Sequence, residues 1–195
     1  MILEQVQNNN SIMKKLLLTL LLPLIAFSSV SYGEEINSLF GITLNDNAEN
    51  YVSSNYIDSN KSKDNETIEG YFDLNITDKI KTKSPYASSY WVVIDSDNRI
   101  HQIRGSDDVV NLEICLEIQK DLFSTFEEKY QVDFDYWEKS LPKFKKYSRY
   151  HWTDSNNIIS IQCTKVYEET SAKRQIYLRS GLLSQAITDF YDSGL

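Results

Sequence analysis

Apolar residues between positions 111 and 130 recur at intervals of three and four, which is the spacing of one face of an α-helix. Charged residues occupy the other side of the same segment, so the pattern predicts a long amphipathic helix with one face toward a core. The apolar positions are Cys115, Ile118, Leu122, Phe126 and Tyr130, and the charged ones are Glu113, Glu117, Lys120, Asp121, Glu127 and Glu128.

Other segments have the patterns of β-strands, either alternation of apolar and polar residues with a period of two or a short apolar run bounded by turn residues. They are residues 71–76, 90–94, 99–104, 158–163 and 175–179. Turns rich in Asp, Ser and Asn at residues 95–98 and 154–157 predict that the strands beside them pair as hairpins. We expect short helices at residues 45–54 and 182–191, a polar loop at 57–66, and a helical segment at 134–146 that Pro142 interrupts.

These elements predict an α+β fold, with an antiparallel sheet built from β-hairpins and helices packed on one face. Trp91 and Trp152 each precede an Asp-Ser-(Asp/Asn)-Asn turn, so the order helix, hairpin, helix occurs twice. The halves, residues 34–130 and 131–195, would then be tandem repeats. One matched segment leaves two explanations open, a true duplication and two hairpins that share a common turn sequence.

The N-terminal segment has the order of a secretory signal peptide. Lys14 and Lys15 precede an apolar run at residues 16–27, and small residues follow. The run is too short to span a bilayer. We expect cleavage after Gly33, which removes residues 1–33. Met13 has the features of a natural start, in which case residues 1–12 are a misassigned extension.

The remaining chain, residues 34–195, is of a suitable length for a single exported domain in the periplasm or outside the cell. A composition rich in Lys, Asn and Ile favours an AT-rich bacterium as the source over a eukaryote. The formal net charge of −8 disfavours nucleic acid and anionic membranes as partners. Once the signal peptide is removed, no stable membrane insertion is expected.

The chain has two cysteines, Cys115 in the long predicted helix and Cys163 in a predicted strand. Exported cysteines usually pair because the compartment is oxidising, so we expect a disulfide between helix and sheet. The alternative is a reactive thiol. Glu113 and Glu117 beside Cys115, and the absence of a Cys-x-x-Cys pair, disfavour that alternative because they do not lower a thiol pKa.

Motifs that would identify a reaction are missing from the sequence. There is no Gly-x-Ser-x-Gly, no His-Glu-x-x-His and no glycine-rich phosphate loop, and we expect no metal and no cofactor. The two histidines, His101 and His151, lie in predicted strands, where packing or surface roles are common.

A basic and aromatic segment at residues 137–152 interrupts the acidic background. Tyrosine, tryptophan and arginine dominate interface hot spots, so the segment is a candidate binding face. In the alternative explanation, the aromatic rings belong to the core and the lysines are ordinary surface residues. The candidate residues are Lys139, Lys143, Lys145, Lys146, Arg149, Tyr147, Tyr150 and Trp152.

The sequence therefore favours an exported, non-enzymatic binding or inhibitor module whose partner is another envelope or secreted protein. The alternative is an enzyme with a site of scattered residues, acting on cell-wall or other extracellular polymer. A cleft that brings together Glu113, Glu117 or His151 would favour the enzyme, and a flat aromatic patch would favour the binding module. A purely structural role also remains open.

Overall fold

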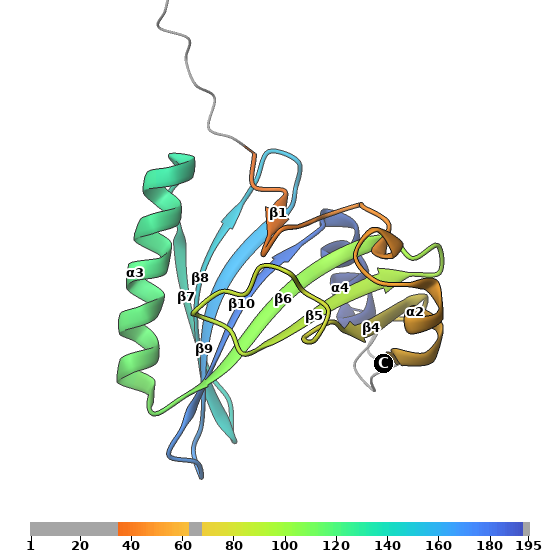
Figure 1. Cartoon of the computed structure of the whole chain (residues 1–195). Helices are drawn as coiled ribbons and strands as arrows, with labels where there is room; N and C mark the ends of the chain where they lie inside the picture. The colour runs from red at the N-terminus through yellow and green to blue at the C-terminus, as the bar shows by residue number, and fades with distance from the viewer. Residues whose placement is uncertain (1–34, 63–67, 193–195) are drawn as a thin grey trace, which may run out of the picture. The chain divides into compact units, whose positions relative to one another are not determined.

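The computed structural model describes residues 35–62 and 68–192, with the backbone alone for residues 191–192. The predicted signal peptide, residues 1–33, lies outside these residues. Eight antiparallel strands form one sheet in the order β3-β4-β5-β6-β10-β9-β8-β7 (Figure 1). The strands are β3 Lys61–Ser62, β4 Tyr71–Asn75, β5 Ser89–Asp95, β6 Ile100–Val109, β7 Asp135–Ser140, β8 Phe144–Trp152, β9 Ile158–Val166 and β10 Ala172–Arg179.

Two meanders make up this sheet, one of strands β3 to β6 and one of strands β7 to β10. They join at the centre, where β10 pairs with β6 over eight residues, from Ala172 opposite Val109 to Arg179 opposite Gln102. A two-stranded sheet of β1 (Ser38–Leu39) and β2 (Ile42–Thr43) precedes them, together with the 3-10 helix η1 (Ala48–Asn50) and helix α2 (Ser54–Asn60).

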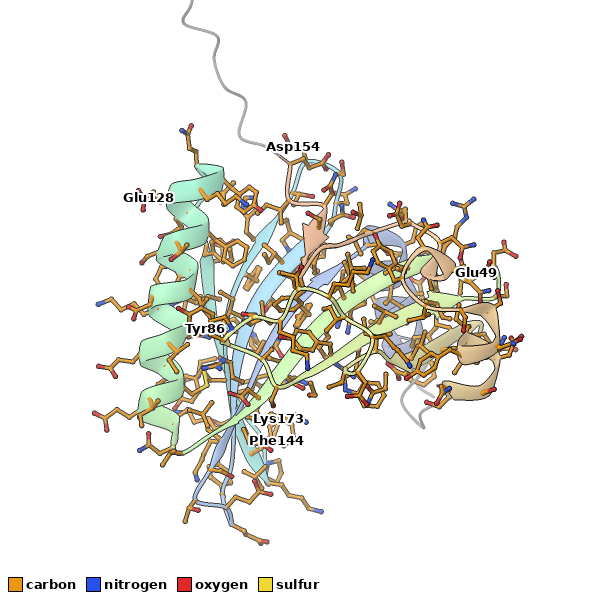
Figure 2. All side chains as sticks on the ribbon, viewed as in Figure 1. Glu49, Tyr86, Glu128, Phe144, Asp154 and Lys173 are labelled. Carbon is orange, nitrogen blue, oxygen red and sulfur yellow. A yellow bond between two sulfur atoms is a disulfide. The ribbon has the colours of Figure 1, made fainter. Side chains whose placement is uncertain are left out.

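Helix α3 (Leu112–Tyr130) is the long amphipathic helix that the sequence predicts. The side chain of Asn111 caps it by accepting a hydrogen bond from the Ile114 amide at 2.9 Å. The helix packs against β9 and β10, and its apolar face joins a core that includes Ile159 and Leu178. Most of its charged side chains are exposed, and Glu128 projects away from the sheet (Figure 2).

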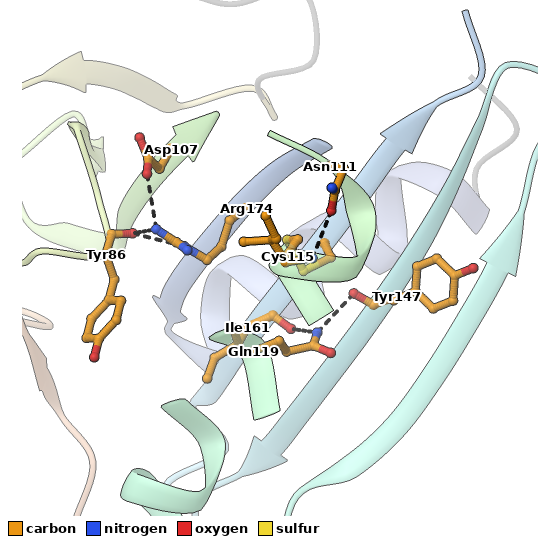
Figure 3. The surroundings of a disulfide bond; sticks show 10 residues. Tyr86, Asp107, Asn111, Cys115, Gln119, Tyr147, Ile161 and Arg174 are labelled. Atoms are coloured by element: carbon orange, nitrogen blue, oxygen red, sulfur yellow. Dashed lines mark hydrogen bonds and ion pairs between the residues drawn. A yellow bond between two sulfur atoms is a disulfide. The ribbon is translucent and has the colours of Figure 1, made fainter. Parts of the chain in front are cut away.

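The predicted disulfide is confirmed. Cys115 of α3 is bonded to Cys163 of β9, both are fully buried, and their Cα atoms lie 5.9 Å apart. One turn further along α3, Gln119 donates from Nε2 to the backbone oxygens of Ile161 at 2.7 Å and Tyr147 at 3.3 Å (Figure 3). A covalent bond and a buried amide therefore fix the same helix to the same strand.

The α+β class and the antiparallel sheet are as predicted, but the helices do not share one face. The register places Ile103 and Leu178 on the α3 side, so Arg104 and Tyr177 point the other way. Helix α4 (Gly181–Asp192) lies on that second side (Figure 1). Its Leu183 lines a groove together with Arg104 and Tyr177. No duplication is shown. If the two halves were repeats, a two-fold axis perpendicular to the sheet would relate the antiparallel strands β6 and β10. That axis would place the helices that follow these strands, α3 and α4, on the same face, whereas they lie on opposite faces.

Three local predictions were wrong. Residues 134–146, expected to be helical, form β7 and the start of β8 around the turn that contains Pro142. The segment expected to be helical at 45–54 contains only the 3-10 helix η1, and α2 continues through residues 57–60, where a loop was expected. Ser53 caps α2, and its Ile57 is fully buried beside β4, which explains why this polar stretch is helical.

Candidate binding face of the sheet

The face of the sheet that α3 does not cover is called the open face here. A groove of about 440 Å³ crosses it from β4 to β8, and α4 forms one wall with Leu183 and Ile187. Six strands therefore contribute to one surface. The other lining residues are Ile68, Tyr71, Asp73, Val93, Gln102, Arg104, Lys146, Gln162, Gln175, Tyr177 and Arg179.

Three cationic side chains meet in this groove, Arg104 of β6, Arg179 of β10 and Lys146 of β8, and Asp73 is the one acidic lining residue. Arg104 lies 3.9 Å from the Asp73 carboxylate and its guanidinium is 5.8 Å from the Trp91 ring centroid. The groove is therefore positively charged, although the whole chain has a formal net charge of −8.

The Nε atom of Arg104 is buried and has no hydrogen-bond partner among the residues that the structure describes. A buried donor without a partner costs free energy, on the order of 1–3 kcal/mol. A ligand carboxylate or phosphate that reached the Arg104 guanidinium would offset part of that cost.

Uncharged donors and acceptors surround the cations. Arg179 donates from Nε to the Gln102 side-chain oxygen at 2.6 Å, and its guanidinium lies 4.8 Å from the Tyr177 ring centroid. Gln162 donates from Nε2 to the Tyr177 hydroxyl at 2.9 Å. These contacts hold the arginine and the amides in place, so the groove is already organised without a ligand.

At the β4 end of the groove, Tyr71 packs edge-on against His101, with ring centroids 5.2 Å apart. Burial and the nearby negative charge of Asp95 raise the pKa of Tyr71, so it stays a neutral phenol that can donate a hydrogen bond. Behind it, His101 Nε2 lies 2.9 Å from Asp95 Oδ2, and His101 Nδ1 lies 3.1 Å from Ser180 Oγ.

In this Asp95–His101–Ser180 row, His101 and Ser180 are buried and Asp95 is partly exposed. Burial alone would raise the pKa of Asp95, but hydrogen bonds from His101 and from the Arg99 and Asp97 amides outweigh it and lower that pKa. Ser180 also caps α4 by accepting from the Leu183 amide at 3.3 Å.

The structure divides the predicted binding residues between two faces. Lys139, Lys146, Tyr150 and Trp152 lie on the open face, by their register in β7 and β8. The others do not belong to that surface. Lys145, Tyr147 and Arg149 lie on the α3 side and Lys143 lies in the turn after Pro142.

The three on the α3 side have local contacts there. Tyr147 packs beside the disulfide, and Lys145 Nζ lies 2.6 Å from Glu138 Oε1. The Arg149 guanidinium is 4.1 Å from the Phe123 ring centroid. Only Lys146 of the predicted set lines the cationic groove.

A second hollow of about 630 Å³ lies along the other side of α4. Trp152, which is 48% exposed, and Ser180 are among the residues that line it. The remaining candidates do not meet there. Glu113 and Glu117 are exposed on α3, and His151 donates a hydrogen bond from Nδ1 to the Asp133 backbone oxygen, 2.9 Å away.

Sequence reasoning missed Arg104 and Arg179, together with the glutamines beside them. Their signal was present in the strand pattern, because Gln102 and Arg104 in one strand and Gln175 and Arg179 in another occupy the polar positions of the alternation. The pairing of β6 with β10 brings these positions together, and that pairing is not encoded in either segment alone.

Comparison with protein-family models, with curated proteins and with solved structures found no match to this chain. Within the described residues, none of the helices has both the length and the apolar composition needed to cross a membrane. The same residues contain no group of three or more His, Cys, Asp or Glu side chains placed to hold a metal ion.

Proposed function

We propose that this protein is an exported, non-enzymatic binding module that holds an acidic segment of another envelope or secreted protein on its open face. The observation that carries the proposal is the meeting of Arg104, Lys146 and Arg179 in one groove of an acidic chain. Three strands distant in sequence supply these cations, and Gln102 and Tyr177 position one of them.

A protein partner fits this surface because the groove spans six strands and shares its face with exposed aromatic residues. Trp137 and Trp152, 40% and 48% exposed, lie on the open face by their register in β7 and β8. Aromatic and arginine side chains around a desolvated centre are typical of interface hot spots. Carboxylates of the partner would pair with the guanidinium groups, which bind carboxylates in two-pronged geometry.

A location in the periplasm or outside the cell is part of the proposal. The buried disulfide supports it, since such bonds persist in oxidising compartments, as does the signal-peptide pattern of the sequence.

Affinity capture from an envelope extract tests the proposal, with the protein immobilised and its disulfide intact. The test variant is R104E/K146E/R179E. The control variant, K81E/K83E/K120E, reverses the same number of charges at exposed positions outside the groove. We expect the control to capture the partner and the test variant to lose it. Equal capture by both variants would contradict the proposal.

The Asp95–His101–Ser180 row supports one alternative function, a hydrolase acting on an acyl group of an extracellular polymer. A serine hydroxyl next to a histidine that a carboxylate orients is the arrangement of an activated nucleophile. Ser180 lines the larger hollow, but it is only 3% exposed and already caps α4. A serine-directed fluorophosphonate probe decides between the roles, because an active nucleophile is labelled and the S180A variant is not.

A further inference from the structure

Strand β7 (Asp135–Ser140) forms one edge of the sheet, and all six of its residues are exposed. The strand at the opposite edge, β3, has only two residues. An exposed edge strand presents a row of backbone groups that can pair with another chain. β7 contains no proline, although Pro142 follows it, so each residue of the strand keeps its amide.

The hydrogen bonds of the neighbouring strands show which backbone groups of β7 face outward. The Leu141 amide donates to the Phe144 oxygen at 2.9 Å, so Leu141 faces β8. In an antiparallel pair, the backbone groups of successive residues point alternately toward the partner strand and away from it. The backbone groups of Lys139, Trp137 and Asp135 therefore also bond to β8.

It follows that Tyr136 and Glu138 direct their amides and carbonyls away from the sheet. A second bond agrees with this alternation. The Tyr167 amide donates to the Lys143 oxygen at 3.1 Å. The backbone groups of odd-numbered residues in β8 therefore bond to β9, and those of even-numbered residues bond to β7.

We propose that β7 pairs with β7 of a second copy of this chain, antiparallel and about a two-fold axis at Trp137. Only residues with outward backbone groups can exchange hydrogen bonds across the edge. Pairing Glu138 with Glu138 of the second copy would oppose like charges, which is destabilising. Pairing Tyr136 with Glu138 of the second copy avoids this repulsion. The two-fold symmetry forms the same pair a second time, so the outward backbone groups of Tyr136 and Glu138 find partners in both copies.

The side chains in this register are complementary. Asp135 comes to lie opposite Lys139 of the second copy, and the symmetry repeats the pair. Trp137 lies opposite its own copy at a position without mutual hydrogen bonds, where cross-strand side chains approach most closely. Trp137 is 40% exposed and Tyr136 is 51% exposed, so the pairing covers two large aromatic rings.

The two-fold axis is perpendicular to the sheet, so the open faces of both copies point the same way. The product is one continuous sheet with two cationic grooves on one side. This dimer does not depend on what the grooves bind, and its test is independent of the capture experiment.

Charge exchange across the edge tests the proposal in the full chain, with the disulfide intact, by sedimentation velocity over a range of concentrations. The D135K variant places a lysine opposite Lys139 of the second copy at each pair. The K139D variant places an aspartate opposite Asp135 of the second copy. We expect either substitution to weaken dimerisation by roughly tenfold or more, since two favourable pairs become two repulsive ones. The double variant D135K/K139D restores the opposite charges, and we expect it to restore the dimer.

Both residues are exposed, so all three variants should keep the circular dichroism of the unchanged protein, and the single variants should melt as its monomer does at low concentration. A monomer at the highest soluble concentration of the unchanged protein would overturn the proposal. A dimer that the single substitutions leave intact, or that the double variant fails to restore, would overturn it as well.

Discussion

Gln119 of α3 donates a hydrogen bond of 2.7 Å to the backbone oxygen of Ile161, one helical turn beyond the disulfide from Cys115 to Cys163. Gln119 is only 2% exposed, so its side-chain amide is buried between α3 and the sheet, as the two sulfur atoms are. The helix is thus fixed to β9 at two successive turns, on the side of the sheet away from the cationic groove.

Removing the disulfide should therefore change stability and leave the groove intact. The bond spans 48 residues of sequence, and we expect C115A/C163A to lower the free energy of unfolding by about 4 kcal/mol at most. Urea denaturation of the oxidised protein and of the variant measures the loss. Partner capture by the folded variant should persist, and a loss of capture without unfolding would show that the groove depends on the disulfide.

Lys145 and Lys146 offer a matched pair of substitutions, because they are neighbours in β8 on opposite faces. Lys146 lines the groove, whereas Lys145 forms an ion pair with Glu138 on the α3 side. We expect K146E to weaken partner capture by roughly tenfold or more, as loss of a central charged contact does. K145E should bind like the unchanged protein. A comparable loss in both variants would point to net charge rather than the groove.

Asp95 should give the protein an acid-sensitive component of stability. Its pKa is lower in the folded chain, so its contribution is complete above the pKa of the unfolded chain and is lost as the pH falls through the folded value. We expect D95N to cost about 1–3 kcal/mol at neutral pH, because the carboxylate accepts several hydrogen bonds.

Urea denaturation from neutral pH down to about pH 3 should show the difference between D95N and the unchanged protein shrinking as the pH falls. Asp154, exposed in the corresponding turn of the second hairpin, provides the control D154N. A penalty for D95N that stays constant with pH would assign it to lost packing instead.

Gly105 in the middle of β6 lies directly beneath the ring of Phe40. A Cβ atom there would approach two ring carbons at 2.6 Å and the Ala87 Cβ at 2.9 Å. We expect G105A to lower the free energy of unfolding by about 1–3 kcal/mol, the usual cost of overpacking. In an F40A background the added cost should be smaller, since the obstructing ring is gone. Equal costs in both backgrounds would identify Ala87 as the obstacle.

The sequence was most informative where the determinants are local or where the compartment limits the chemistry. The three-to-four spacing predicted α3, and the alternation and turn chemistry predicted the β5–β6 and β8–β9 hairpins. The disulfide was predicted from the expected export and from the position of Cys163 on the apolar side of its strand. These inferences needed no knowledge of which strands become neighbours.

Strand β7 was missed because an edge strand exposed on both sides has no alternation to detect, and it was interpreted as part of a helix. The sequence could not assign helix α4 to a face of the sheet. Its apolar residues indicate that one side of the helix is buried, but they do not indicate which face of the sheet covers it. The groove was missed because Arg104 and Arg179 lie far apart in sequence, and the two-cation pattern exists only after β6 and β10 pair.

The pairing of β6 with β10 also constrains the order in which the protein can fold. A central strand, β6, is complete at Val109, but its second neighbour, β10, is complete only at Arg179, near the end of the chain. Until residues 172–179 are present, β6 and β9 each lack the strand that pairs with them in the finished sheet. Because long-range pairing is slow and open edges promote aggregation, the arrival of β10 removes two open edges of a partly made chain and leaves the sheet edges at β3 and β7.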